Sequence, residues 1–251
     1  MTTVLAAVDE SATNEPLLAG AVALAALLDA EARAVHVREG DGSQAVAEVA
    51  AGLGVPLRIV DGTVSDVLAE MSGDPDVVAL AVGSRDVPAA ACPPGHIAME
   101  LVTAVRKPVL VIPPDAAQPS RLREVLVPLD GTMQTAEALS EAISFAVKNG
   151  LEVSIVHVHD ESCLPCFEDQ PQHESAAWVD EFLRRYCAID GKLPVVTRIG
   201  DVADEILAVS QERGTDLIML AWKRDLAPGR AAVVRDLLTR SSVPLLLYPC
   251  D

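Results

Sequence analysis

The tripeptide Val35-His36-Val37 recurs as Val156-His157-Val158, 121 positions further along the chain. The pair Val8-Asp9 recurs at the same offset as Leu129-Asp130. A constant offset between separate motifs is typical of an internal duplication. The sequence therefore predicts two copies of one structural unit.

Each copy alternates short apolar runs with helical patterns, which indicates βαβ units and a parallel sheet covered on both faces. The first copy predicts strands at 4–8, 32–37, 57–60, 77–82 and 109–112, and helices at 14–28, 44–53, 63–71 and 95–106. The second predicts strands at 125–128, 153–158, 194–198, 217–221 and 245–248, and helices at 134–148, 173–188, 201–213 and 230–240. We expect an α/β fold of two doubly wound domains in tandem, residues 1–115 and 122–251, each with a five-stranded parallel sheet.

A proline-rich stretch at 113–121 breaks the periodicity and predicts a linker between the copies. The last strand of each copy, at 109–112 and at 245–248, is apolar on both faces and would otherwise be an exposed edge. We expect these two strands to meet, so that the halves form an intramolecular pair about a pseudo-twofold axis. Whether two chains also form a homodimer stays open.

The net charge of −18 is spread over both halves. Nucleic acids and anionic membranes recruit basic surfaces, so neither is an expected partner. The first residues contain no basic segment and run directly into a strand pattern, which predicts no secretory signal. The five cysteines are odd in number and scattered, as is typical of reduced thiols, and they favour a cytoplasmic location.

The order of these motifs resembles the universal stress protein family, twice over. An acidic residue closes the first strand of each copy (Asp9, Asp130), a Val-His-Val strand follows, and each copy ends in a helix and a Pro-flanked apolar strand. The resemblance covers nearly the whole chain. It implies an adenine nucleotide alpha hydrolase-like sheet with its ligand at the carboxyl edge.

Nucleotide-binding members of that family carry Gly-x2-Gly-x9-Gly-Ser/Thr after the fourth strand, where backbone amides and a helix N-terminus hold phosphate. The first copy departs from this pattern: Asp86 stands at the second glycine, and Gly95-His96 follows Gly83 at a shorter spacing with histidine in place of the hydroxyl residue. In the second copy Lys223 replaces the first glycine, and only a short loop leads to Gly229-Arg230.

Two interpretations of these loops stay open, one functional and one structural. Gly95-His96 and Gly229-Arg230 could each hold an anion, together with Asp9 and Gly83 in the first copy and Asp130 in the second. ATP is then a cofactor candidate, chiefly for the first domain. Alternatively the sites are degenerate and the glycines serve folding.

Several other features have a functional and a structural interpretation. Cys163-Leu-Pro-Cys166 could bind metal or act in redox chemistry, or be an incidental loop pair. The repetition of His36 as His157 favours a structural role at the strand end. Trp178, Phe182 and Tyr186 form a core-facing helical stripe. Trp222 is expected at the mouth of the second site, filling space that a ligand would otherwise take.

No catalytic motif is recognisable in the sequence, so an enzyme is not expected. The sequence predicts a stress-response or regulatory binding module with degenerate nucleotide sites. One alternative is an ATP-binding switch or slow ATPase using the first domain. The other is a metal or redox sensor acting through Cys163 and Cys166.

Overall fold

A computed structural model describes residues 1–10, 14–38, 44–84, 96–117, 121–159, 181–182, 185–186, 193–225 and 231–250. Its first half contains β1 (Thr3–Val8), α1 (Asn14–Leu27), β2 (Glu31–Arg38), α2 (Gln44–Gly52), β3 (Leu57–Asp61), α3 (Val64–Ser72), β4 (Val77–Gly83), α4 (His96–Ala104) and β5 (Val109–Ile112). The second half contains β6 (Glu124–Pro128), α5 (Met133–Lys148), β7 (Glu152–His159), β8 (Val195–Ile199), α7 (Val202–Arg213), β9 (Leu217–Trp222), α8 (Ala232–Arg240) and β10 (Leu245–Pro249).

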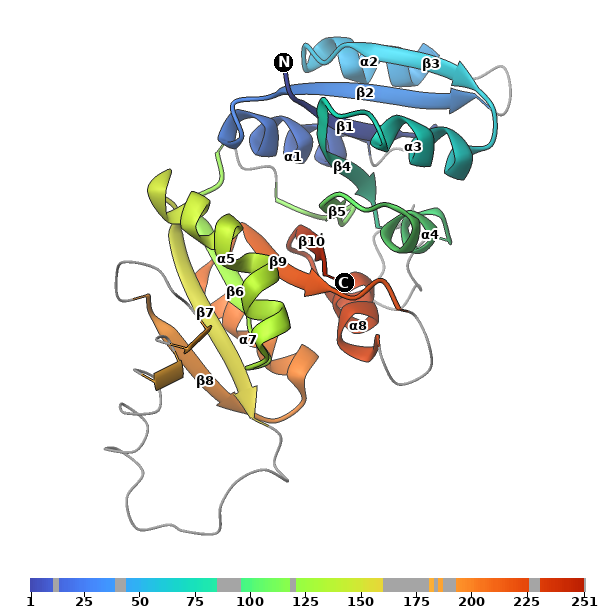
Figure 1. The fold of residues 1–251 in the computed structure, drawn as a ribbon. Coiled ribbons are helices and arrows are strands. Elements are labelled where there is room, and N and C mark those ends of the chain that lie inside the picture. Colours follow the sequence, from blue (N-terminus) through green and yellow to red (C-terminus); the bar gives the residue numbers. More distant parts are fainter. Residues whose placement is uncertain are drawn as a thin grey trace, which may run out of the picture.

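The ten strands form one sheet in the order β3-β2-β1-β4-β5-β10-β9-β6-β7-β8 (Figure 1). Within each half all neighbouring strands are parallel. The two halves join where β5 and β10 pair antiparallel, with Leu110 opposite Leu246. The α/β fold class is confirmed, and the two last strands do meet as expected. The two predicted sheets are therefore halves of one continuous sheet.

Helices cover both faces of this sheet. Helices α1, α2 and α5 pack on one face together with Phe182. Helices α3, α4, α7 and α8 pack on the other. Each of the two cores contains residues from both halves, so the hydrophobic effect stabilises the joined sheet as well as each half.

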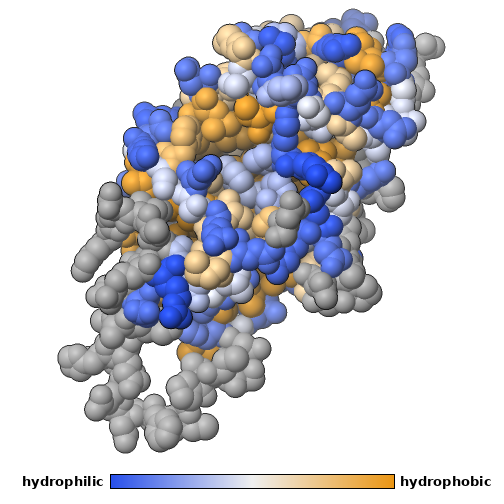
Figure 2. Space-filling view, viewed as in Figure 1, coloured by the Kyte–Doolittle hydropathy of each residue, from blue (hydrophilic) through white to orange (hydrophobic). Residues whose placement is uncertain are grey.

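Helix α1 lies unusually close to the sheet. A Cβ atom added to Gly20 would stand 2.3 Å from Cδ1 of Ile112 on β5, which explains why the helix carries glycine there. The only charged residue of α1 is Glu15. Figure 2 shows hydrophilic residues over much of the visible face and an apolar area over α1.

The linker is less separate from the fold than its prolines suggest. The Ala116 N–H donates to the carbonyl of Pro113 at 3.1 Å, and Ala116 and Leu122 are buried in the α1/α5 core. Residues 118–120 and most of the predicted helix at 173–188 lie outside the described residues. None of the described helices is long and apolar enough to cross a membrane.

Candidate functional site

The second half has a cavity at the carboxyl edge of the sheet, where β6, β7 and β9 end beneath α7 and α8. We call it the second-half pocket; its volume is about 360 Å³. This is within the usual range of small-molecule sites. Residues that follow β6 and β9 line it together with residues from the carboxyl half of β7, as the switch-point rule for doubly wound sheets predicts.

The walls of the second-half pocket are mostly aliphatic. Val156 and Leu220 come from the sheet, and Ile206 comes from α7. All three side chains are buried. Val158 and Val202 widen this apolar slot. Such a slot favours a flat or aliphatic group from which water must be removed.

Asp130 marks the polar end of the pocket, directly after β6. Its Oδ1 accepts hydrogen bonds from the Thr132 N–H at 2.9 Å, the Thr132 hydroxyl at 2.9 Å and the Thr135 hydroxyl at 2.5 Å. Thr132 is also the N-cap of α5 and accepts from the Thr135 N–H at 3.4 Å. The first turn of α5 therefore fixes the orientation of the carboxylate.

These hydrogen bonds also set the charge of Asp130. Partial burial raises the pKa of the carboxyl, but the bonds from Thr135 and Thr132 and the ammonium of Lys223 lower it, and the net shift is downward. Asp130 is therefore a fixed negative charge at neutral pH. Lys223 and Asp225 also line the pocket, and Lys223 is close enough to Asp130 to act on its charge.

The loop expected to bind an anion in this half is only partly placed. Gly229 and Arg230 lie outside the described residues. Helix α8 begins just after them, and its residues Val233 and Val234 line the pocket. The expectation that only a short loop leads to Gly229-Arg230 therefore stays a prediction.

In the first half the predicted site residues are not brought together in the same way. Asp9 is exposed after β1, and its main chain exchanges hydrogen bonds with the Asn14 side chain: Asp9 N–H donates to Oδ1 at 3.3 Å, and Nδ2 donates to the Asp9 carbonyl at 2.5 Å. Gly83 ends β4, and open space surrounds the position of its missing Cβ. Gly95 lies outside the described residues, and His96 is the first residue of α4.

The repeated histidines have equivalent structural roles. His36 Nδ1 lies 3.0 Å from the Val8 carbonyl, and His157 Nδ1 lies 2.7 Å from the Leu129 carbonyl. A carbonyl oxygen only accepts, so Nδ1 carries the proton in both rings. Each histidine thus ties the end of the first strand of its half to the second strand. His157 also contacts the rings of His159 and Phe182, at centroid distances of 4.6 and 5.0 Å.

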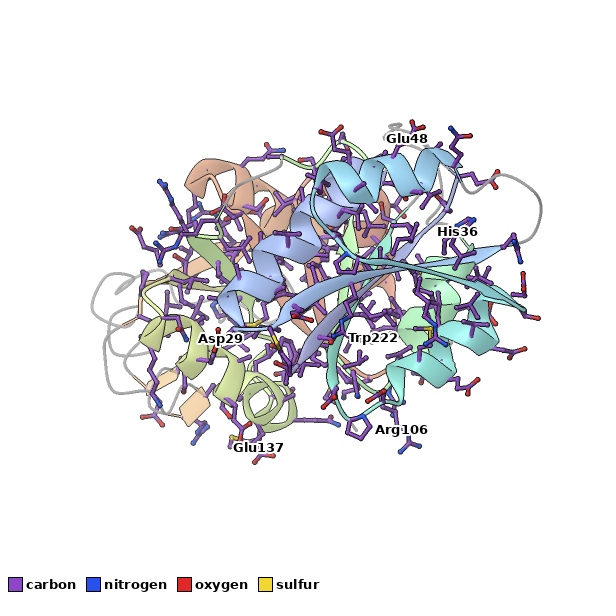
Figure 3. All side chains as sticks on the ribbon, turned by 90° about the horizontal axis from the view of Figure 1, so that it is seen from above. Asp29, His36, Glu48, Arg106, Glu137 and Trp222 are labelled. Atoms are coloured by element: carbon purple, nitrogen blue, oxygen red, sulfur yellow. The ribbon has the colours of Figure 1, made fainter. Side chains whose placement is uncertain are left out.

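Trp222 lines the second-half pocket, where the sequence places it. Its side chain is buried, and its indole N–H donates across the molecule to the carbonyl of Val102 on α4, at 3.0 Å. Figure 3 shows Trp222 near the centre of the molecule. Its polar atom joins the two halves, which the sequence did not predict, and the expectation that the ring fills space left by an absent ligand stays a prediction.

Other predicted features are settled only in part. Phe182 is buried and Tyr186 packs against the same core, so the predicted stripe faces inward where it is described. Trp178, Cys163 and Cys166 lie outside the described residues. Within the described part of the chain, no group of His, Cys, Asp or Glu side chains is arranged to hold a metal ion.

Comparisons with known proteins place this geometry in a family. The model of the universal stress protein family matches residues 121–249. The chain therefore belongs to the universal stress protein family. The sequence has no significant match among curated proteins.

Solved structures of similar length share the fold of the whole chain. A universal stress protein from Archaeoglobus fulgidus DSM 4304 is similar with a TM-score of 0.67 at 15% identity, over 98% of both chains. A functionally unknown protein from Pseudomonas aeruginosa PAO1 gives a TM-score of 0.70 at 14% identity, over 100% of this chain and 93% of that chain. A putative universal stress protein from Pseudomonas aeruginosa UCBPP-PA14 gives 0.65 at 15% identity, with the same coverage.

Sequence reasoning missed the two threonines that hold Asp130. The stretch Asp130-Gly-Thr132-x2-Thr135 contains an N-cap pattern that could have identified them. At the same offset of 121, Asn14 stands at the position of Thr135. The Asn14 side chain bonds to the main chain of Asp9, whereas the Thr135 hydroxyl bonds to the carboxylate of Asp130.

Proposed function

We propose that this chain is a non-catalytic stress-response protein that binds a small nucleoside-type ligand in the second-half pocket. The observation that carries the proposal is the apolar slot beside a fixed carboxylate at the carboxyl edge of the sheet. The proposal includes a cytoplasmic location, which the scattered cysteines favour.

The chemistry of the pocket matches the two parts of a nucleoside. A planar base fits between Val156, Ile206 and Leu220, where burial of its faces is favourable. The Asp130 carboxylate uses Oδ1 for its three threonine bonds, which leaves Oδ2 to accept from a ribose hydroxyl.

The charges at the polar end argue against a long phosphate chain. Asp130 stays ionised at this end, so a phosphate placed beside its carboxylate meets repulsion. We therefore expect adenosine or AMP to bind more tightly than ATP. This ranking separates the proposal from an ATP switch, which needs several phosphate contacts.

The experiment is a calorimetric titration of the full chain with adenosine, AMP and magnesium-ATP. Asp130→Asn is the test variant, and Asp9→Asn, at the equivalent position of the first half, is the matched control. We expect Asp130→Asn to weaken adenosine binding about tenfold, as for loss of a charge-assisted hydrogen bond. Asp9→Asn should leave binding unchanged.

Two outcomes would contradict the proposal. Tightest binding of ATP, lost in Asp9→Asn and kept in Asp130→Asn, would assign the function to the first half as a nucleotide switch. Absence of heat with all three ligands at millimolar concentration would exclude a nucleoside site.

A further inference from the structure

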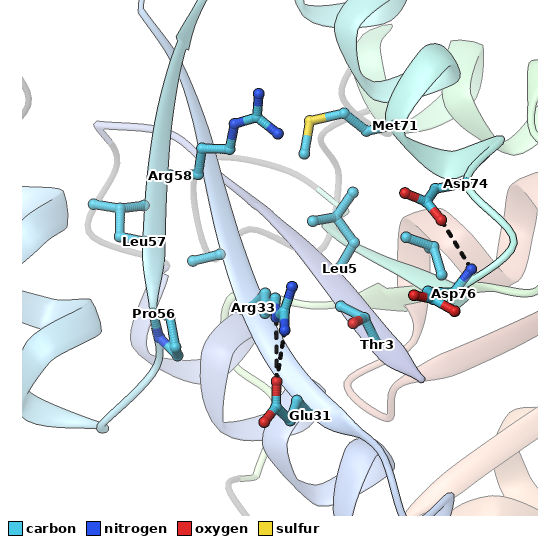
Figure 4. Close-up of a pocket in the computed structure, with 12 residues that line it drawn as sticks. Thr3, Leu5, Glu31, Arg33, Pro56, Leu57, Arg58, Met71, Asp74 and Asp76 are labelled. Atoms are coloured by element: carbon cyan, nitrogen blue, oxygen red, sulfur yellow. Dashed lines mark hydrogen bonds and ion pairs between the residues drawn. The ribbon is translucent and has the colours of Figure 1, made fainter. Parts of the chain in front are cut away.

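A second cavity lies at the opposite edge of the sheet, in the first half. We call it the amino-edge cavity; its volume is about 410 Å³ (Figure 4). It is lined by the residues that begin β1, β2, β3 and β4, and by the end of α3. It is therefore separate from the second-half pocket and from the carboxyl edge of its own half.

The floor of the amino-edge cavity is apolar. Leu5, Ala34 and Val77 are buried side chains of the sheet, and Met71 of α3 is half-buried beside them. A ligand here would remove aliphatic surface from water.

Two arginines form the strand side of the cavity. Arg33 on β2 is paired with Glu31, with Nη2 2.8 Å from Oε2. Arg58 on β3 is exposed, and its guanidinium has no ion pair or hydrogen bond among the residues that the structure describes. The first 115 residues carry only six basic side chains, so two of six face this one cavity.

The opposite side is acidic. Asp74 and Asp76 stand in the turn between α3 and β4, and the Asp74 carboxylate accepts from the Asp76 N–H at 2.9 Å. The Lys107 ammonium donates to the main-chain carbonyls of Asp74 and Val77 and so fixes this turn. Figure 4 shows the two arginines on the strand side and the two aspartates on the turn side, with Leu5 between them.

Thr3 supplies a polar group that the fold itself does not use. It is 4% exposed and lines the cavity, yet its hydroxyl bonds to no described residue. Its N–H donates to the Asp76 carbonyl at 2.7 Å, which fixes the main chain of Thr3 beside the turn.

The second half shows that these features are not required by the fold. Strand register places Glu124 at the position of Thr3, Ser154 at that of Arg33 and Val196 at that of Arg58. There the Ser154 hydroxyl donates to Glu124 Oε1 at 3.3 Å, and Arg213 stands 3.8 Å from the same oxygen. The second half thus pairs its polar groups with one another, at the place where the first half carries two arginines, one of them, Arg58, without a partner among the described residues.

The charge balance decides the class of ligand. The lining holds two guanidinium groups and three carboxylates, with the arginines on the strand side and Asp74 and Asp76 on the turn side, so a ligand that carries both charges can pair with both sides. We propose that the amino-edge cavity binds a zwitterionic α-amino acid with an aliphatic side chain. Its carboxylate faces Arg33 and Arg58, its ammonium faces Asp76 and the Thr3 hydroxyl, and its side chain covers Leu5 and Met71.

The test is a calorimetric titration of the full chain with three molecules of one shape. L-leucine carries both charges, 4-methylpentanoate lacks the ammonium, and 3-methylbutylamine lacks the carboxylate. We expect leucine to bind and each analogue to bind about tenfold more weakly or worse, since each loses a charge-assisted contact.

Exposed residues provide variants that leave the fold intact. Arg58→Gln and Asp76→Asn should each weaken leucine binding about tenfold. Arg38→Gln, at the other end of β2, and Asp130→Asn, in the second-half pocket, should leave it unchanged. Absence of leucine binding at millimolar concentration, equal binding of either analogue, or binding indifferent to Arg58→Gln and Asp76→Asn would each overturn the proposal.

Discussion

Replacing Trp222 with phenylalanine removes the indole N–H that joins the two halves and keeps most of the aromatic ring. The Val102 carbonyl that accepts this bond is close to the end of α4, where main-chain carbonyls have no partner within the helix. Both residues are buried, with Trp222 4% and Val102 1% exposed. Water therefore has little access to replace the lost donor.

The magnitude follows from two contributions. A buried acceptor left without a donor costs about 1–3 kcal/mol, and the smaller ring leaves a gap that costs roughly 1 kcal/mol more. The expected loss of unfolding free energy is thus about 2–4 kcal/mol. For a chain of this length, it corresponds to a Tm lower by roughly 5–15 °C.

Urea unfolding followed by far-ultraviolet circular dichroism measures this loss. Phe145→Leu is the control, because Phe145 is 38% exposed on α5 and its change should stay within about 0.5 kcal/mol. If Trp222→Phe also stays within that margin, the hydrogen bond to Val102 contributes nothing and the reasoning is refuted.

Two further predictions concern packing and alkaline pH. Gly20→Ala should gain about 1 kcal/mol of helix propensity, but its methyl group should clash with Cδ1 of Ile112, so we expect a net loss of unfolding free energy of roughly 1 kcal/mol. Ile112→Val removes Cδ1 and should relieve the clash in the double variant. If urea unfolding shows that the losses of the two single variants simply add, the clash is disproved. Burial raises the pKa of Tyr248 to about 12, so the folded state holds this proton more tightly than the unfolded chain, whose tyrosines titrate near pH 10. The stabilisation is full below about pH 10 and is lost as the pH rises toward about 12. Tyr248→Phe should flatten the fall of stability in that window; identical pH profiles for Tyr248→Phe and the parent protein would exclude the effect.

Much of the fold could be read from local sequence because local forces decide it. Alternating apolar runs and helical periodicity place β5 at its observed bounds and most other elements within one or two residues. The repeated histidines were correctly interpreted as structural because duplication keeps a bond that each half needs. The apolar character of β5 and β10 also indicated that they cover one another.

The candidate sites were much harder to predict, because they depend on which side chains the sheet brings together. Asp130 was found as a strand-end acid, but its threonine partners were not. Trp222 was expected at the second site, but its hydrogen bond to Val102 could not be predicted, since Val102 is 120 residues away in the chain. The amino-edge cavity had no sequence motif at all, because its residues begin four separate strands.

By itself, then, the sequence determined the duplication, the class of fold and the strand-end acids, which follow from periodicity and from residues adjacent in the chain. Only the tertiary structure decided that the two sheets become one, that Trp222 connects the halves, and that arginines and aspartates from distant segments face one cavity. The physical reason is that hydrophobic burial is encoded residue by residue, whereas a pocket is defined by the register of strands that packing brings side by side.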